Sequence, residues 1–307
     1  QVRPILVGLG FSEIITYSFI SSDAIDALGG EEKSPLRSFV RILNPLTTEQ
    51  SVMRTSLIPG LMSTIKTNIL HDEKALRLFE WGKVFFGTGE ARLPIEKVFL
   101  GGVMTGRFDQ KAWHSDERHV DFYDIKGAVE ALLDDLGFDD IRFERQEGFP
   151  GYDRELSAGM YDGETLLGQI GRVSPLVMEA YELDKQEVYL FELDMEALLK
   201  SDPGRRPFRP LARFPAVYRD ISIVVAREVE SASIEEIIRR IGGDLLESVH
   251  IFDLYEGKGI GPSEKALAFR ICYRSEKGTL DGGEVNRLHG SVMDAIGQET
   301  GGKLREG

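Results

Sequence analysis

The chain has 307 residues, of which 42% are hydrophobic, and a net charge of −14 at pH 7. This length and composition suggest about two globular domains. The single cysteine excludes an internal disulfide and is typical of a reducing, cytoplasmic setting, and no apolar run approaches the roughly 20 residues of a membrane helix. There is no basic-then-apolar leader, and the chain opens at Gln1 within an amphipathic run, so we expect a piece of a longer protein.

The first two-thirds of the chain contains long strands with few helices between them. Ser56 is a candidate N-cap for a helix that has Pro59 in its first turn, and a capped helix ends at Gly137. This pattern favours the α+β class, with an antiparallel sheet flanked by helices. In chain order we predict a helix end at 4–11, a strand at 12–20, a helix within 44–70, strands at 76–86 and 97–106, a helix at 121–137, and strands at 164–173 and 188–195.

A domain boundary is predicted at KSDPGRRPFRP (200–210), where three prolines and a glycine exclude a continuing helix or central strand. We therefore predict domains at 1–202 and 203–307. The second domain carries 16 basic and 16 acidic side chains, so all of the excess acid lies in the first. Because an acidic surface repels phosphate, any nucleic acid should prefer the second domain. The alternative is that the arginines of segment 200–210 belong to an ordinary charged, solvated linker.

The second domain has the pattern strand, helix, strand, strand, helix, strand. Its helices are predicted to start at two capping boxes, Ser233 with Glu236 and Asp281 with Glu284. The order βαββαβ is the ferredoxin-like split pattern, in which both helices pack on one face of the sheet and leave the other open. The predicted strands are 219–225, 248–255, 265–274 and 302–306.

The sequence offers no clear catalytic or metal-binding set. His114 and His119 are five residues apart and do not share a helix face, and Cys272 alternates within a strand like a small hydrophobic residue. IRFER (141–145) is similar to the ATP-binding arginine strand of class II aminoacyl-tRNA synthetases, with GQIGRV (168–173) as the nearest second motif. We interpret both as structural strands. We expect no catalytic residue, metal ligand or bound cofactor in this chain.

Seven ordered blocks of the sequence resemble one known family, the beta subunit of phenylalanyl-tRNA synthetase. They run almost from end to end of the chain in the family's order, which is far more specific than one short motif. The blocks are GLGFSEIITYSF (8–19), NPLTTEQSVMRTSLIPGL (44–61), LRLFEWGKVF (76–85), DFYDIKGAVEALL (121–133), FPAVYRDISIVV (214–225), IFDLYEGKG (251–259) and TLDGGEVN (279–286).

The resemblance implies a division of labour between the two domains. The first is similar to the family's catalytic-like module, a class II synthetase fold without the active residues, which packs against the catalytic alpha subunit in a heterotetramer. The second is similar to the ferredoxin-fold anticodon-binding domain, so the implied partners are the alpha subunit and tRNA(Phe), with no DNA and no membrane. The holoenzyme would use ATP and magnesium, while this piece alone would be inactive. A pure protein-interaction scaffold without RNA binding and an active class II ligase stay open as alternatives.

The open face of the second domain is where we expect RNA to bind. Strand alternation places Ser222, Ala266 and Arg305 on this face, and Tyr255 joins them if a bulge corrects the phase of its strand. We predict that Tyr255 stacks a base with its hydroxyl in water, Ser222 hydrogen-bonds to RNA, Ala266 leaves room for a base, and Arg305 contacts phosphate. An ordinary tyrosine that covers a core edge is the alternative for Tyr255.

The basic run RRPFRPLAR (205–213) stands directly before this domain. Its arginines would offset the repulsion between RNA and the acidic first domain. We expect Arg206 and Arg213 to contact RNA. Arg219 is less favoured for this role, because it is followed by Asp220 and an internal ion pair is the alternative.

Overall fold

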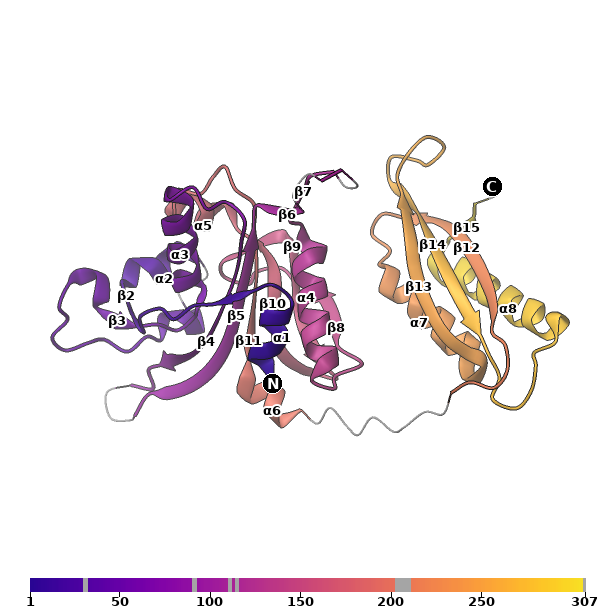
Figure 1. Ribbon diagram of the computed structural model, residues 1–307, viewed down its shortest axis with the longest axis horizontal. Coiled ribbons are helices and arrows are strands. Elements are labelled where there is room, and N and C mark those ends of the chain that lie inside the picture. Colours follow the sequence, from indigo (N-terminus) through magenta and orange to yellow (C-terminus); the bar gives the residue numbers. More distant parts are fainter. Residues whose placement is uncertain (30–32, 90–92, 110–111, 114–115, 202–210, 306–307) are drawn as a thin grey trace. The chain divides into compact units, whose positions relative to one another are not determined.

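The two units of the chain each have a hydrophobic core of their own and are shown in Figure 1. They comprise Gln1–Arg206 and Pro207–Gly307. The computed structural model describes residues 1–29, 33–89, 93–109, 112–113, 116–201 and 211–305. Within these ranges, none of the helices combines the length and the hydropathy needed to cross a membrane.

A seven-stranded sheet forms the centre of the first unit (Figure 1). Its order is β1-β4-β5-β11-β10-β9-β8, and neighbouring strands are antiparallel except for β1 with β4. The strands are β1 Ser12–Glu13, β4 Leu76–Phe86, β5 Ile95–Thr105, β8 Arg142–Arg145, β9 Tyr152–Asp162, β10 Thr165–Val173 and β11 Val188–Asp194. Two small ladders pair β2 Phe19–Ile20 with β3 Val52–Met53, and β6 Arg107–Asp109 with β7 Arg118–His119.

Helices cover both faces of this sheet. Adjacent residues of β11 show the two sides, because Phe191 belongs to the core beneath α1, α4 and α6 while Leu190 belongs to the core beneath α2, α3 and α5. The two buried faces explain why β11 is apolar without interruption from Val188 to Phe191. The helices are α1 Val2–Gly8, α2 Ser22–Ala27, α3 Ile58–Leu70, α4 Phe122–Asp135, α5 Pro175–Ala180 and α6 Met195–Lys200, and the short 3₁₀ turns are η1 Pro35–Arg37 and η2 Thr48–Gln50.

A buried ion pair ties the segment before α3 to the sheet. Arg54 Nη1 lies 2.8 Å from Glu80 Oε1 on β4, and the two side chains are only 4% and 2% exposed. Thr16 Oγ1 donates a 2.7 Å hydrogen bond to the same carboxylate, and Arg54 Nε donates to the Lys83 carbonyl at 2.8 Å. Such a pair is stable in a core only because these further hydrogen bonds satisfy its remaining polar atoms.

A second buried carboxylate, Glu192 on β11, lies at the start of α3. It accepts hydrogen bonds from Leu57 N at 2.6 Å and from Ser56 Oγ at 3.1 Å. Burial raises the pKa of Glu192 to about 7, although these hydrogen bonds oppose the shift. Ser56 Oγ also accepts from Ile58 N at 3.1 Å, but the N-cap of α3 is Leu57, so the predicted N-cap at Ser56 is one residue too early.

The α+β class is confirmed, and most predicted elements of the first unit are found with small differences at their ends. The predicted strand at 12–20 is wrong, because Ser12–Glu13 pairs with β4 while Phe19–Ile20 pairs with β3. Between them the chain turns to place Thr16 against Glu80. Strand alternation does not predict β9 Tyr152–Asp162, because the first half of this strand is polar and does not alternate.

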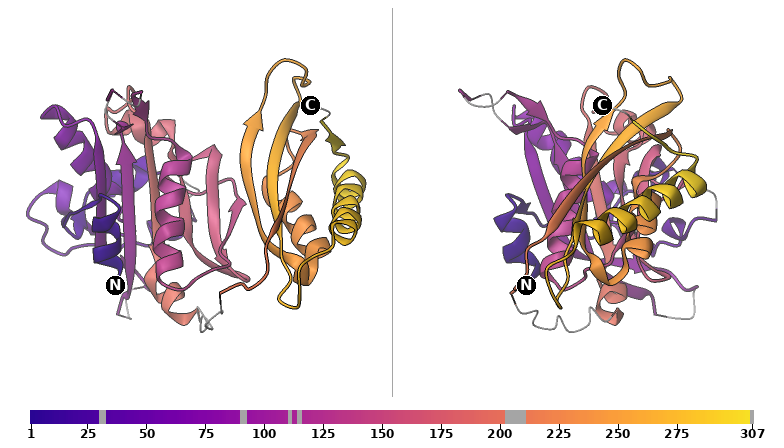
Figure 2. Two further views of the ribbon diagram at one scale, coloured as in Figure 1. Left: turned by 45° about the vertical axis from the view of Figure 1, so that its right-hand side comes forward. Right: turned by 90° about the vertical axis from the view of Figure 1, so that its right-hand side faces the viewer.

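The second unit is a four-stranded antiparallel sheet with two helices on one face (Figure 2). Its elements follow the predicted βαββαβ order, and the sheet order is β13-β14-β12-β15. Asp281 caps α8 as expected, whereas α7 begins at Ser231, two residues before the predicted capping box, and Ser233 Oγ instead donates to the Glu230 carbonyl. The elements are β12 Val217–Ala226, α7 Ser231–Gly242, η3 Gly243–Leu245, β13 Leu246–Tyr255, β14 Glu264–Tyr273, α8 Gly282–Thr300 and β15 Lys303–Leu304.

Candidate nucleic-acid interface

The helix-free face of the second unit's sheet brings together four of the residues that the sequence singled out. Its position is set by the core, because Ile221 and Ile223 of β12 are buried against the helices and the residues between them point the other way. The register places Tyr255 and Ala266 side by side. Arg305 follows β15, and its backbone N–H donates to the Ser222 carbonyl at 2.9 Å.

A β-bulge at Phe252 places Tyr255 on this face. Ile251 pairs with Phe269 and Asp253 pairs with Ala268, so Phe252 is an extra residue in β13. The extra residue shifts the alternation by one position. Val249 can therefore be buried in the core while Tyr255 lies on the helix-free face. The bulge that the sequence analysis required is present.

Tyr255 is held on two sides. Its hydroxyl donates a 3.3 Å hydrogen bond to the Lys258 carbonyl, and this bond lies at an exposed position. A Cβ at position 257 would overlap the end of the ring, so only glycine fits there without a shift of the tyrosine. The guanidinium of Arg305 lies over the ring, with Cζ 4.4 Å from the ring centroid.

Ser222 and Ala266 differ in how accessible they are. Ser222 is half-buried on β12. Ala266 lies on the helix-free face but is only 2% exposed, because it is a small residue between the larger side chains of Val224 and Tyr255. The expectation that Ala266 is open to an approaching base is therefore wrong for this conformation. Contact with RNA at either residue stays a prediction.

The basic run before the domain is described only in part. Arg206 lies outside the described residues, and Arg213 is exposed in the segment that leads into β12. Arg219 points to the helix side, where its Nη2 donates to Asn286 Oδ1 at 2.9 Å. The alternative of an internal pair between Arg219 and Asp220 is not found, because Asp220 pairs with another arginine.

That partner, Arg270 of β14, is a cation on the helix-free face that the sequence analysis missed. It donates two hydrogen bonds to Asp220, at 2.8 and 2.7 Å, and these bonds raise the pKa of Arg270 and lower that of Asp220. Its guanidinium also lies 5.3 Å from the ring of Phe252, which is 56% exposed. Alternation from Ala266 and Ala268 would have placed Arg270 on this face.

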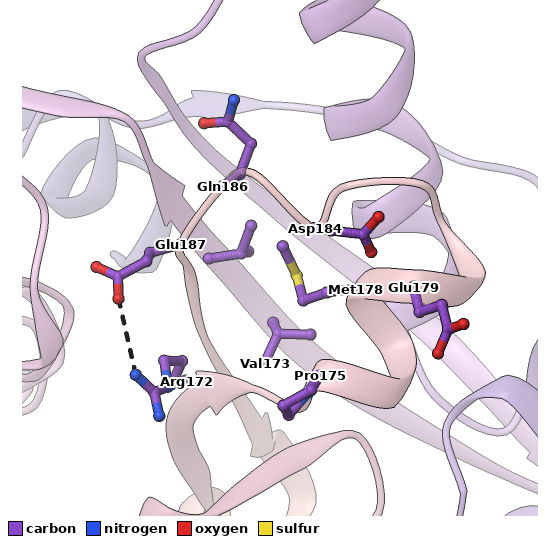
Figure 3. Close-up of a pocket in the computed structure, with 9 residues that line it drawn as sticks. Arg172, Val173, Pro175, Met178, Glu179, Asp184, Gln186 and Glu187 are labelled. Carbon is purple, nitrogen blue, oxygen red and sulfur yellow. Dashed lines mark ion pairs between the residues drawn. The ribbon is translucent and has the colours of Figure 1, made fainter.

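The arginines that resemble an ATP site in the first unit are already engaged by carboxylates. Arg172 lines a hollow of about 540 Å³ and pairs there with Glu187 at 3.7 Å (Figure 3). It also pairs with Asp153 at 2.9 Å. Glu179 and Asp184 also line the hollow, so its acidic character disfavours a phosphate. Arg142 is exposed, donates to the Gly163 carbonyl at 2.6 Å, and pairs with Glu144 at 3.1 Å. Among the described residues, no cluster of three His, Cys, Asp or Glu side chains could hold a metal ion.

Two family models cover most of the chain. Residues 1–195 match the phenylalanyl-tRNA synthetase beta chain CLM domain, and residues 212–305 match the ferredoxin-fold anticodon-binding domain. The chain belongs to the phenylalanyl-tRNA synthetase beta chain family. The second match agrees with the βαββαβ order of β12 to β15.

Curated relatives of the beta chain family are similar over 99% of this chain. A phenylalanine–tRNA ligase beta subunit from Syntrophotalea carbinolica is 38% identical, and those from Carboxydothermus hydrogenoformans and Syntrophus aciditrophicus are 37% identical. The chain spans about 38% of the length of each. Two solved pyrrolysyl-tRNA synthetase structures from Desulfitobacterium hafniense, 18% and 17% identical, match 64% of this chain and 64% and 67% of theirs, with TM-scores of 0.47 and 0.48.

The first unit exposes apolar side chains on two segments, one that leads into β2 and one that precedes β3. The segments are joined by the β2–β3 ladder and by a hydrogen bond from Ile42 N to the Ser51 carbonyl. Single exposed apolar residues are common, but several on adjacent segments are typical of a protein-binding surface. We call this surface the arm; its side chains, 76% to 93% exposed, are Ile15, Tyr17, Leu43 and Leu46.

Proposed function

We propose that this chain is the C-terminal part of a phenylalanine–tRNA ligase beta subunit and that its second unit binds the anticodon region of tRNA(Phe). The observation that carries the proposal is the helix-free face of a ferredoxin-fold sheet that holds Tyr255, Ser222 and Arg305 together. Single-stranded RNA loops are recognised by stacking on aromatic rings and by hydrogen bonds to base edges. Arginine beside such a ring supplies charge for phosphate or a plane for stacking.

The first unit is proposed to support the catalytic alpha subunit without doing chemistry. Arg142 and Arg172 are paired with carboxylates, which supports a structural role for both over contact with ATP phosphates. The arm offers apolar area for a protein partner, and the alpha subunit is the partner that the family implies. In this proposal ATP and magnesium are used by the cytoplasmic holoenzyme at the alpha subunit, and this piece alone forms no aminoacyl-adenylate.

A filter-binding titration with tRNA(Phe), with and without the alpha subunit, tests the RNA part of the proposal. The chain should bind tRNA(Phe), and binding should weaken as salt rises because phosphate contacts release counterions. Saturable binding of the alpha subunit with no effect of the chain on tRNA affinity would instead favour a pure scaffold. Phenylalanine-dependent ATP–pyrophosphate exchange by the chain alone would contradict the inactive role and favour an active ligase.

A further inference from the structure

The ring of Tyr255 is already stacked in the free chain. Arg305 lies over it, with the guanidinium carbon 4.4 Å from the ring centroid. This is the geometry of a cation–π contact, and a planar guanidinium covers an aromatic ring much as a base would. Any base that stacks on this side of Tyr255 has to take the place of Arg305.

Tyr255 and Arg305 differ in how their side chains are held. Gly257 leaves room for the hydroxyl end of the ring, and the Lys258 carbonyl accepts from the hydroxyl at 3.3 Å. By contrast, among the residues that the structure describes, no carboxylate or carbonyl pairs with the guanidinium of Arg305. Arg270 on the same face is different, because two hydrogen bonds to Asp220 hold it in place.

We infer that Arg305 is a displaceable cap on the Tyr255 stacking position, and that Gly257 and the Lys258 carbonyl form the fixed seat of that position. This inference rests on the proposed RNA-binding function of the second unit. On binding, one RNA base replaces the guanidinium over the ring, and the released Arg305 turns its charge to a backbone phosphate. The favoured base is a purine, because its larger surface stacks more strongly than the guanidinium that it replaces.

The cap and the phosphate contact have opposite effects on affinity. Removal of the cap frees the ring and should strengthen binding by about two- to fivefold, the usual size of an exposed cation–π contact. Removal of the charge should weaken binding at low salt, where phosphate contacts are strong. At about 1 M salt the charge is screened, so the gain from an open ring should remain.

Binding of an anticodon stem–loop RNA of tRNA(Phe) to the full chain, measured from low salt to about 1 M, tests this inference. The Arg305→Ala variant should bind more weakly than the parent at low salt and about two- to fivefold more tightly at high salt, so that the two salt curves cross. Lys303→Ala is the matched control, because Lys303 is exposed and pairs with Val224 beside the same face. The RNA affinity of Lys303→Ala should be lower than that of the parent at low salt and equal to it at high salt, so that the two curves do not cross.

A proton NMR signal gives a second readout. The side-chain δ protons of Arg305 should be shifted upfield by the Tyr255 ring in the free chain, and Gly257→Ala or addition of the RNA should remove this shift. An Arg305→Ala curve that stays at or below the parent at every salt concentration, or an Arg305 shift that persists with RNA bound, would overturn the cap. Absence of RNA binding by the parent chain would overturn the proposed function itself, and the cap with it.

Discussion

Arg54 and Glu80 form a buried ion pair on which the first unit depends. Arg54→Ala would leave the Glu80 carboxylate charged and uncompensated in a site that is 2% exposed. The expected loss in the free energy of unfolding is about 3–5 kcal/mol. Both tryptophans of the chain, Trp81 and Trp113, lie in the first unit, so urea unfolding followed by tryptophan fluorescence measures this unit alone.

The exposed pair of Lys83 with Glu96 is the control for this prediction. Its two charged atoms lie 2.7 Å apart, but the side chains are 58% and 49% exposed. Glu96→Gln should change the free energy of unfolding by less than about 1 kcal/mol, because water screens the pair. Equal losses in the two variants would contradict the claim that burial makes the Arg54–Glu80 pair important.

Glu192 should make the stability of the first unit fall as the pH rises from about 4.5 to 7. Burial raises the pKa of Glu192 to about 7, so the folded unit holds a proton that the unfolded chain has released. The stabilisation is therefore full at low pH and is lost as the pH rises through 7, by up to about 3 kcal/mol. Glu192→Gln should remove this part of the pH dependence in urea unfolding curves. If the free energy of unfolding has the same pH dependence in parent and variant between pH 4.5 and 7, Glu192 does not titrate in this range.

Alternation along a strand was enough to predict which face of the second unit most residues occupy. Ser222 and Arg305 lie where the pattern places them, and Arg270 follows from the same pattern. The burial of Ala266 was not predictable in this way, because it depends on the size and position of its neighbours across the strands. The seat at Gly257 was also missed, since a glycine in a connecting loop more often serves the turn itself than a neighbouring ring.

For whole elements, the strands with which a segment pairs determine features that its local sequence pattern does not predict. The segment 12–20 is rich in strand-forming residues, yet its two ends pair with different strands. In the second unit, unbroken alternation along β13 cannot bury Val249 and also place Tyr255 on the helix-free face. The bulge resolves this conflict, and only the register against β14 shows that the extra residue is Phe252.

Deletion of Phe252 should remove the bulge and leave Tyr255 on the helix-free face. Without the extra residue, Asp253 follows Ile251 directly in the ladder, and regular alternation keeps Tyr255 opposite Ala266. The variant should therefore bind tRNA(Phe) about as tightly as the parent while keeping a folded second unit by circular dichroism. A loss of affinity as large as that of Tyr255→Ala would show that pairing opposite Ala266 is not sufficient to position the tyrosine.

At the scale of the whole chain, the two units have separate cores and should unfold as separate transitions. Phe269 is fully buried in the core of the second unit, and Phe269→Ala should lower the stability of that unit by about 3–5 kcal/mol. Circular dichroism should then show that the second unit unfolds at a lower urea concentration than in the parent. The tryptophan transition of the first unit should stay at the urea concentration found for the parent. A matching shift of the tryptophan transition would mean that the two units unfold together.

The family resemblance was accessible from the sequence because several blocks keep their order along the whole chain. The charge is also divided unevenly along the chain, since the excess of acidic side chains lies before residue 203. A neutral unit with cations on one sheet face is a better site for RNA than the acidic unit that precedes it. We propose that RNA is recognised through this face.

The affinity of Tyr255→Ala for tRNA(Phe), measured in the complex with the alpha subunit, tests whether RNA binds to this face. Loss of one stacked base corresponds to about 1–3 kcal/mol, so affinity should fall by roughly ten- to a hundredfold. Tyr255→Phe should keep most of the affinity, and Tyr123→Ala, which removes an exposed tyrosine of the first unit, should keep all of it. Phenylalanine activation should be unchanged in all three variants. An unchanged tRNA affinity in correctly folded Tyr255→Ala would contradict RNA stacking on this face.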